Sequence, residues 1–296
     1  MAMVPVLDAH HHLWDLSVRE QPWLATHRDL APLRRDFGLT DLEPLAAAAG
    51  VIGTVIVQTV TEPGETPEML ALAASDSLII AVVGWTDLTA AGVADELAAL
   101  RARPDAGWLA GIRHPVLTEA NPEWLIRADV LRGLAAVGAA GLTYDVVARP
   151  TQLPTAGLAA SQVTDLVFVL DHLGNAAVEP KVDEEWLAAF RRFAALPNTV
   201  GKLSGIFAQP PPPDAPERGD DGPEVEHLRP YYEIALEAFG PERLMFGSDW
   251  PVSSLGAPYG DVVGAARKLT RDLTPAEQEA IFGGTARRVY RIGAGH

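Results

Sequence analysis

Histidine and aspartate side chains follow several short apolar segments of this 296-residue chain. Three consecutive histidines, His10, His11 and His12, follow the first segment, His172 ends the sixth, and Asp249 ends the last. Side chains alternate along an extended strand, so His10 and His12 share one face and His11 takes the other. Imidazole and carboxylate groups bind Zn²⁺ and also handle protons near neutral pH. The pattern predicts either a divalent-metal site with an open water position or a metal-free group that activates water directly.

Eight short apolar runs, separated by helical stretches, must position these side chains. Strands that are apolar on nearly every residue and alternate with helices indicate a parallel sheet covered on both faces. The expected strands are Val4–Asp8, Val51–Gln58, Leu78–Trp85, Trp108–His114, Gly141–Val147, Leu166–His172, Thr199–Ser204 and Arg243–Asp249. Eight such units predict one (β/α)8 barrel, a TIM barrel forming a single domain over residues 1–296. An open nucleotide-binding sheet is disfavoured, because no Gly-x-Gly-x-x-Gly follows the first strand and no Gly-x-x-x-x-Gly-Lys is present.

Barrel closure has a direct consequence for the site. The carboxyl ends of all strands meet on one face, and the eighth strand lies beside the first. Asp249 is therefore expected beside His10 and His12. Helix starts are predicted at Thr40 and Thr274, since each is followed three residues later by a glutamate in the pattern of a capping box.

Five motifs occur in order over nearly the entire chain. They are Asp8-Ala-His10-His11-His12-Leu-Trp14-Asp15, Gly111-Ile-Arg113-His114-Pro115, Asp171-His172-Leu-Gly174, Lys202-Leu-Ser204-Gly205 and Gly247-Ser-Asp249-Trp250-Pro251. In this order the chain resembles the amidohydrolase superfamily, in its amidohydrolase-related branch of sugar-lactone and aromatic-pathway lactonases. Enzymes similar to L-fuconolactonase and L-rhamnonolactonase are nearest in pattern.

The resemblance implies that His10, His12 and His172 define the metal or substrate pocket, with Asp249 as a further ligand and as the proton-handling base. Binuclear members of the superfamily carry a carboxylated lysine on the fourth strand, where this chain has Arg113 and His114. At most one divalent metal is therefore expected, with Zn²⁺ as the first choice. Metal-free catalysis stays open.

Other strand-end residues are candidates for substrate contacts. His114 is expected to polarise a lactone carbonyl and Arg113 to bind one of its oxygens, although a structural ion pair would also explain Arg113. A buried lysine commonly only pairs a carboxylate, and tryptophans equally serve as core packing. The remaining candidates are Gln58, Tyr144, Lys202 and Ser204 as polar contacts, and Trp14 and Trp85, with Trp250, as an apolar wall.

Together with these residues, the resemblance implies a hydrolase that opens a lactone ring by attack of activated water on the carbonyl. Hydroxyl-reading groups beside indoles suit a neutral, polyhydroxylated sugar lactone better than a dicarboxylate. A metal-dependent decarboxylase of the same superfamily is the alternative, and a non-catalytic binding protein is a third hypothesis.

Composition restricts the partners to a small-molecule substrate. A net charge of −16 and a pI near 4.8 argue against nucleic-acid binding. No apolar run approaches the length that spans a bilayer, so no membrane association is expected. The start of the chain lacks the pattern of a secretory signal and the chain has no cysteine, so the cytoplasm is the expected location. A homo-oligomer is compatible with the sequence, which leaves the oligomeric state open.

One segment departs from the barrel pattern. Residues 209–230 are rich in proline and acidic side chains and cannot bury much apolar surface. We expect an insertion after the seventh strand, either a solvated loop or a lid over the site.

Overall fold

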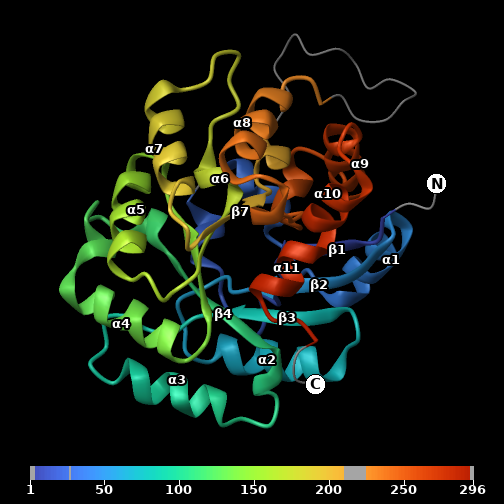
Figure 1. Ribbon diagram of the computed structural model, residues 1–296. Helices are drawn as coiled ribbons and strands as arrows, with labels where there is room; N and C mark the ends of the chain where they lie inside the picture. The colour runs from blue at the N-terminus through green and yellow to red at the C-terminus, as the bar shows by residue number, and fades with distance from the viewer. Residues whose placement is uncertain (1–3, 27, 210–224, 294–296) are drawn as a thin grey trace.

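The computed structural model describes residues 4–26, 28–209 and 225–293. Eight parallel strands pair in chain order and form a nearly closed barrel, with helices arranged around it (Figure 1). The strands are β1 (Val6–His11), β2 (Val51–Val57), β3 (Ile79–Gly84), β4 (Leu109–Pro115), β5 (Thr143–Val147), β6 (Phe168–Leu170), β7 (Thr199–Leu203) and β8 (Leu244–Phe246). The predicted (β/α)8 barrel is confirmed, and each predicted strand is present with ends moved by a few residues.

Helices connect the strands and cover the outside of the sheet. They are α1 (Leu39–Ala49), α2 (Glu65–Ser75), α3 (Val93–Arg101), α4 (Ala128–Ala139), α5 (Leu153–Gln162), α6 (His172–Asn175), α7 (Glu184–Ala194), α8 (Arg229–Phe239), α9 (Tyr259–Thr270), α10 (Pro275–Glu279) and α11 (Thr285–Val289). Among the described residues, no helix is both long enough and apolar enough to cross a bilayer.

Two apolar cores hold the barrel. The larger lies between the sheet and the helices. The smaller joins residues of seven strands to the C-terminal helix, and consists of Ala9, Val55, Val57, Ala81, Val83, Ala110, Val169, Val200, Met245, Ala286, Val289 and Tyr290. Helix α11 and Tyr290 thereby close the floor of the barrel, at the end opposite the functional side chains.

The two predicted helix starts have different outcomes. At Thr274 the capping box is present, because Thr274 and Glu277 exchange hydrogen bonds between side chain and backbone. At Thr40 the prediction was wrong, since Thr40 lies inside α1. The first turn of α1 is instead held by Asp41, whose carboxylate accepts the Gly38 N–H at 3.0 Å.

An irregularity in β1 turns two consecutive residues toward the barrel interior. Between Asp8 and His11, β1 has one residue more than the facing segment of β2. Ala9 packs in the interior core, and the ring of the next residue, His10, also lies inside the barrel. One extra residue of this kind is a β-bulge, which re-aims the side chains that follow it.

The barrel closes just beyond β8. The Asp249 N–H donates to the His10 carbonyl at 2.8 Å, and the His12 N–H donates to the Trp250 carbonyl at 2.7 Å. The predicted proximity of Asp249 to the first-strand histidines is therefore a consequence of closure.

The acidic, proline-rich segment predicted at 209–230 falls largely on residues 210–224, which lie outside the described residues. At its described start, the Gln209 side chain accepts the Val178 N–H at 2.7 Å and donates to the Ala176 carbonyl at 2.7 Å. At its described end, Val225 is buried.

Candidate active site

Three imidazoles surround one carboxylate oxygen at the mouth of the barrel. The Nε2 atoms of His10, His12 and His172 lie 3.7, 3.7 and 3.8 Å from Oδ1 of Asp249. The Nε2 atoms of His10 and His12 are 3.1 Å apart. The four side chains come from β1 and the residue after it, the start of α6 and the loop after β8, and all four residues are at least 93% buried. Residues from both ends of the chain thus form one compact donor set.

Backbone geometry and hydrogen bonds orient these groups. His172 and Asp249 have φ values of +55° and +59°, a conformation that costs free energy for residues other than glycine. The Nδ1 of His12 lies 2.8 Å from the Val57 carbonyl, and the Nδ1 of His172 lies 2.9 Å from the Ser204 hydroxyl. Because a carbonyl can only accept, Nδ1 of His12 carries the hydrogen, and its Nε2 presents a lone pair to the centre of the cluster.

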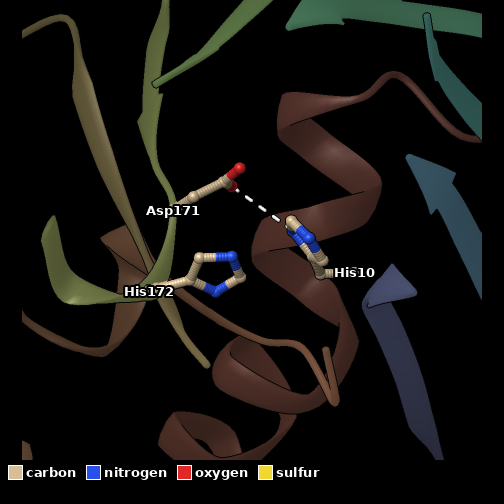
Figure 2. Close-up of side chains that lie close together, drawn as sticks. All are labelled: His10, Asp171 and His172. Carbon is tan, nitrogen blue, oxygen red and sulfur yellow. Dashed lines mark ion pairs between the residues drawn. The ribbon is translucent and has the colours of Figure 1, made fainter. Parts of the chain in front are cut away.

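A buried group of charged residues lies beneath the histidines. Asp171, the residue before His172, has its carboxylate 3.3 Å from Arg113, 3.0 Å from Lys202 and 3.4 Å from Nδ1 of His10. Figure 2 shows this carboxylate facing the His10 ring. Lys202 also donates to Asp145 at 2.6 Å, and its Nζ lies 3.2 Å from Nδ1 of His10.

Sequence reasoning missed both Asp171 and Asp145 as site residues. Asp171 was visible as a residue of the Asp-His-Leu-Gly motif. Asp145 had only its position on the fifth strand as a signal.

Burial controls the protonation of the cluster. Desolvation lowers the pKa of His12 to about 3 and also lowers the pKa values of His10 and His172, so these rings are neutral near pH 7. Burial raises the pKa of Asp249, with His172 and Arg113 opposing the shift. Burial also acts to raise the pKa of Asp171, but Lys202 and His10 hold it well below the usual value. Neutral imidazoles keep the lone pairs that a metal needs.

The donor set fits a divalent ion. Tetrahedral zinc with bonds of about 2.0–2.1 Å to nitrogen and oxygen requires ligand atoms about 3.3 Å apart, and the spacings of 3.1, 3.7 and 3.7 Å among His10, His12 and Asp249 are close to this. His10, His12 and Asp249 form one group of suitable ligand atoms, and His10, Asp171 and His172 form another. The second group lies against the cationic ends of Arg113 and Lys202, which oppose a further cation. The first group is the better metal site.

Arg113 and Gln58 lie together at the inner edge of the cluster. The Arg113 guanidinium donates to the Gln58 carbonyl, and the Gln58 amide donates to the Arg113 carbonyl at 3.2 Å. Nη1 of Arg113 is 3.4 Å from Nε2 of His10. Among the described residues, Nε of Arg113 and Oε1 of Gln58 have no hydrogen-bond partner. Of the Arg113 atoms, Nη1 is the one in contact with the imidazoles.

His114 lies in a different group from the histidine cluster. Its Nδ1 accepts the indole N–H of Trp85 at 3.1 Å, its Nε2 lies 2.8 Å from the Glu119 carboxylate, and its ring stacks on Trp124 at 4.2 Å. Both ring nitrogens are therefore occupied by protein groups. His114 therefore has no free ring nitrogen with which to polarise a carbonyl, as had been expected of it. Trp85 donates the hydrogen bond that orients the His114 ring.

Tyr144 and Trp14 also depart from their expected places. Tyr144 is the second residue of β5 and does not end it. Its ring packs on Phe168 between the sheet and the helices. The opposite face of this strand carries Asp145, toward Lys202. Trp14 packs on Phe37 and lines a separate cavity of about 510 Å³ that the histidines do not line. Trp250, the third member of the expected wall, packs on Phe37 as well.

Comparison with known proteins gives consistent matches. Residues 7–292 match the family model described as Amidohydrolase. The chain is 35% identical over 293 residues to the L-fucono-1,5-lactonase of Burkholderia multivorans, covering 97% of this chain and 96% of that protein. It is 32% identical over 290 residues to the L-fucono-1,5-lactonase of Burkholderia ambifaria, covering 97% and 95%. A solved amidohydrolase from Burkholderia multivorans with bound zinc is 35% identical, with a TM-score of 0.86 and coverage of 97% and 99%.

Proposed function

The chain belongs to the amidohydrolase family, and from this premise we propose that it is a lactonase that opens a neutral sugar lactone. The observation that carries the proposal is the convergence of three neutral imidazoles on the Asp249 carboxylate, in a chain whose two named relatives are lactonases. The decarboxylase alternative has no comparable support, because neither of these relatives is a decarboxylase.

Asp249 acts as the base in this proposal. Its carboxylate takes a proton from a water molecule as the water oxygen attacks the lactone carbonyl carbon. When the ring carbon–oxygen bond breaks, Asp249 returns the proton to the leaving alkoxide. The raised pKa of Asp249 suits both steps, because a more basic carboxylate accepts the proton more readily and can still release it.

Arg113 is proposed to stabilise the negative charge that develops on the carbonyl oxygen. Its guanidinium lies beside His10 and is held in place by Asp171 and the Gln58 carbonyl. Its Nη1 lies 3.4 Å from Nε2 of His10, so the guanidinium presents its positive charge to the centre where an oxyanion would form. His172, oriented by Ser204, keeps Asp249 facing the centre of the site.

His10, His12 and Asp249 would hold one divalent ion, with zinc as the proposed metal and His172 beside Asp249. When bound, such an ion supplies a Lewis acid that polarises the carbonyl and lowers the pKa of water. Metal analysis of protein purified without chelator tests the number: we expect no more than one transition metal per chain, and two stoichiometric metals would contradict the proposal.

The charge of the site supports a neutral substrate. Arg113 and Lys202 are the buried cations there, and both already pair with Asp171, while Lys202 also pairs with Asp145. With Asp249 included, three carboxylates surround two cations. The side chains there offer a dicarboxylated lactone no unpaired cation, so the single divalent ion alone would face both of its carboxylates, in a chain of net charge −16.

A panel of lactones tests the substrate class. Neutral aldonolactones, L-fuconolactone and its deoxy and epimeric relatives among them, should be hydrolysed with a kcat/KM well above that for pyrone dicarboxylates or muconolactone, read with a pH indicator at matched concentrations. Faster turnover of the anionic lactones would show that the site has been misread. Release of carbon dioxide from aromatic carboxylates, without lactone hydrolysis, would indicate a decarboxylase.

Two further expectations belong to this proposal. We place the enzyme in carbohydrate metabolism because its substrate would be a sugar lactone. We also propose the cytoplasm as its location, which rests on the cysteine-free sequence alone.

A further inference from the structure

Asp8 connects the elements that carry the proposed metal ligands and base. Asp8 is fully buried. Oδ1 accepts the backbone N–H of Ser248 at 2.7 Å and that of His10 at 3.1 Å, and Oδ2 accepts the Tyr259 hydroxyl at 3.0 Å. One carboxylate thus links β1, the loop after β8 and the first residue of α9.

The bond to His10 closes the bulge in β1. The carboxylate of Asp8 occupies the N–H of the residue two positions later, at the point where β1 has its extra residue relative to β2. Without this acceptor, the His10 N–H would be buried and unpaired, and the bulge would lose the contact that fixes it. Because the bulge turns His10 into the barrel, Asp8 determines where the His10 ring lies.

The bond to Ser248 acts on the base itself. Asp249 follows Ser248 and has a φ of +59°, so its conformation has to be imposed by its surroundings. Asp8 holds the N–H before Asp249, and the His10 carbonyl holds the N–H of Asp249. These two contacts fix the peptide units on which the Asp249 side chain is oriented.

Tyr259 fixes the carboxylate in turn. Its ring is buried at the start of α9, and its hydroxyl donates to the oxygen of Asp8 that the two backbone N–H groups leave free. We propose that Asp8 and Tyr259 form a positioning pair that sets the distance between the Asp249 carboxylate and the His10 imidazole. Neither residue touches the substrate, so the pair acts on turnover and not on substrate binding.

A graded set of variants tests the pair. In Asp8→Asn the amide oxygen still accepts both backbone N–H groups and the NH₂ faces Tyr259, so kcat should stay within about threefold of wild type. In Asp8→Ala all three hydrogen bonds are lost, and kcat should fall about 10²-fold, the effect of displacing a reacting group by about 1 Å. KM should stay within about twofold in both variants. Equal losses in Asp8→Asn and Asp8→Ala would overturn the proposal, since rescue by the isosteric amide is its signature.

Tyr259→Phe removes one hydroxyl and provides a variant that should fold. We expect a fall in kcat of about three- to tenfold, with an unchanged KM, because the carboxylate loses one of its three donors. The matched control is Tyr232→Phe in α8, a buried tyrosine whose hydroxyl has no partner among the described residues. A kcat for Tyr259→Phe equal to that of the control would contradict the pair.

The kcat and KM tests rest on the proposed function, because they need lactonase activity. Hydrogen exchange does not need activity, so it tests the positioning pair separately. Hydrogen–deuterium exchange of peptides covering Ser248 and Asp249 should be faster in Asp8→Ala and Tyr259→Phe than in wild type and Tyr232→Phe. Unchanged exchange in Asp8→Ala would overturn the positioning role. If wild type hydrolyses no lactone but exchange responds as expected, the proposed function fails and the pair stands.

Discussion

Adjacent residues of one strand have very different surroundings in this barrel. His10 and His11 are both fully buried, but His10 contacts two further imidazoles, a lysine and two carboxylates, whereas neither ring nitrogen of His11 has a partner among the described residues. Arg113 lies against His10 and Asp171, whereas His114 is stacked on an indole and bonded on both nitrogens to other protein groups.

The fifth strand repeats the contrast. Asp145 pairs with Lys202 inside the barrel, while Tyr144 beside it packs outward, and its hydroxyl has no partner in the part of the chain that the structure describes. Residue type and position along the strand are therefore not enough to assign a role. The face decides, because only inward side chains can meet residues from other strands at the barrel axis.

The largest effect is expected at Asp249, which lies among the inward-facing histidines. Asp249→Asn keeps the shape of the side chain but removes the base, so kcat should fall by about 10² or more with the fold retained. Steady-state hydrolysis and circular dichroism measure this, with the exposed Asp165→Asn as control. Turnover near that of wild type would remove Asp249 from the chemistry.

The next comparison separates His12 from His11. His12→Ala removes an inward ligand and should weaken Zn²⁺ binding by at least about tenfold, measured by competition with a chelating dye. His11→Leu should leave zinc affinity unchanged and should not lower the melting temperature, because it replaces a buried ring without hydrogen bonds by an apolar side chain. Similar losses of zinc affinity in both variants would contradict the division by faces.

A smaller difference is expected between Arg113 and His114. Arg113→Lys keeps the charge but loses the planar fork that reaches both Asp171 and the Gln58 carbonyl, so kcat/KM should fall about tenfold. His114→Gln should change kcat/KM by no more than about threefold, since His114 acts only on the wall of the site. The reverse order would restore His114 as a participant.

Tyr144→Phe should have the smallest effect. Its hydroxyl is buried without a partner among the described residues, so removal should leave kcat unchanged and raise the free energy of unfolding by up to about 1 kcal/mol. Urea denaturation measures the second quantity. A loss of activity would contradict the outward position of Tyr144 and would mean that its hydroxyl contacts the substrate.

The strands could be predicted because each is apolar on both faces, as a parallel sheet between two cores requires. Alternation also indicated which two of the three first-strand histidines share a face. It could not identify Asp171 and Asp145, because a buried carboxylate is recognised by its partners, and Lys202 and Arg113 come from other strands. Alternation also could not show that Tyr144 faces outward. An apolar run does not mark where its strand begins or ends, so Tyr144 was expected at the end of the fifth strand, whereas it is the second residue of β5.

The joint between the first and last strands also governs when the enzyme becomes active. Asp8 and Ser248, which are bonded across this joint, are 240 positions apart in the chain. Bringing such distant segments together carries the loop-closure entropy of almost the whole polypeptide, so this contact is expected to form late in folding. During synthesis His10, His12 and His172 leave the ribosome before Asp249 does. A nascent chain that stops before residue 249 lacks the base, and chemistry begins only once β1 and the loop after β8 have met.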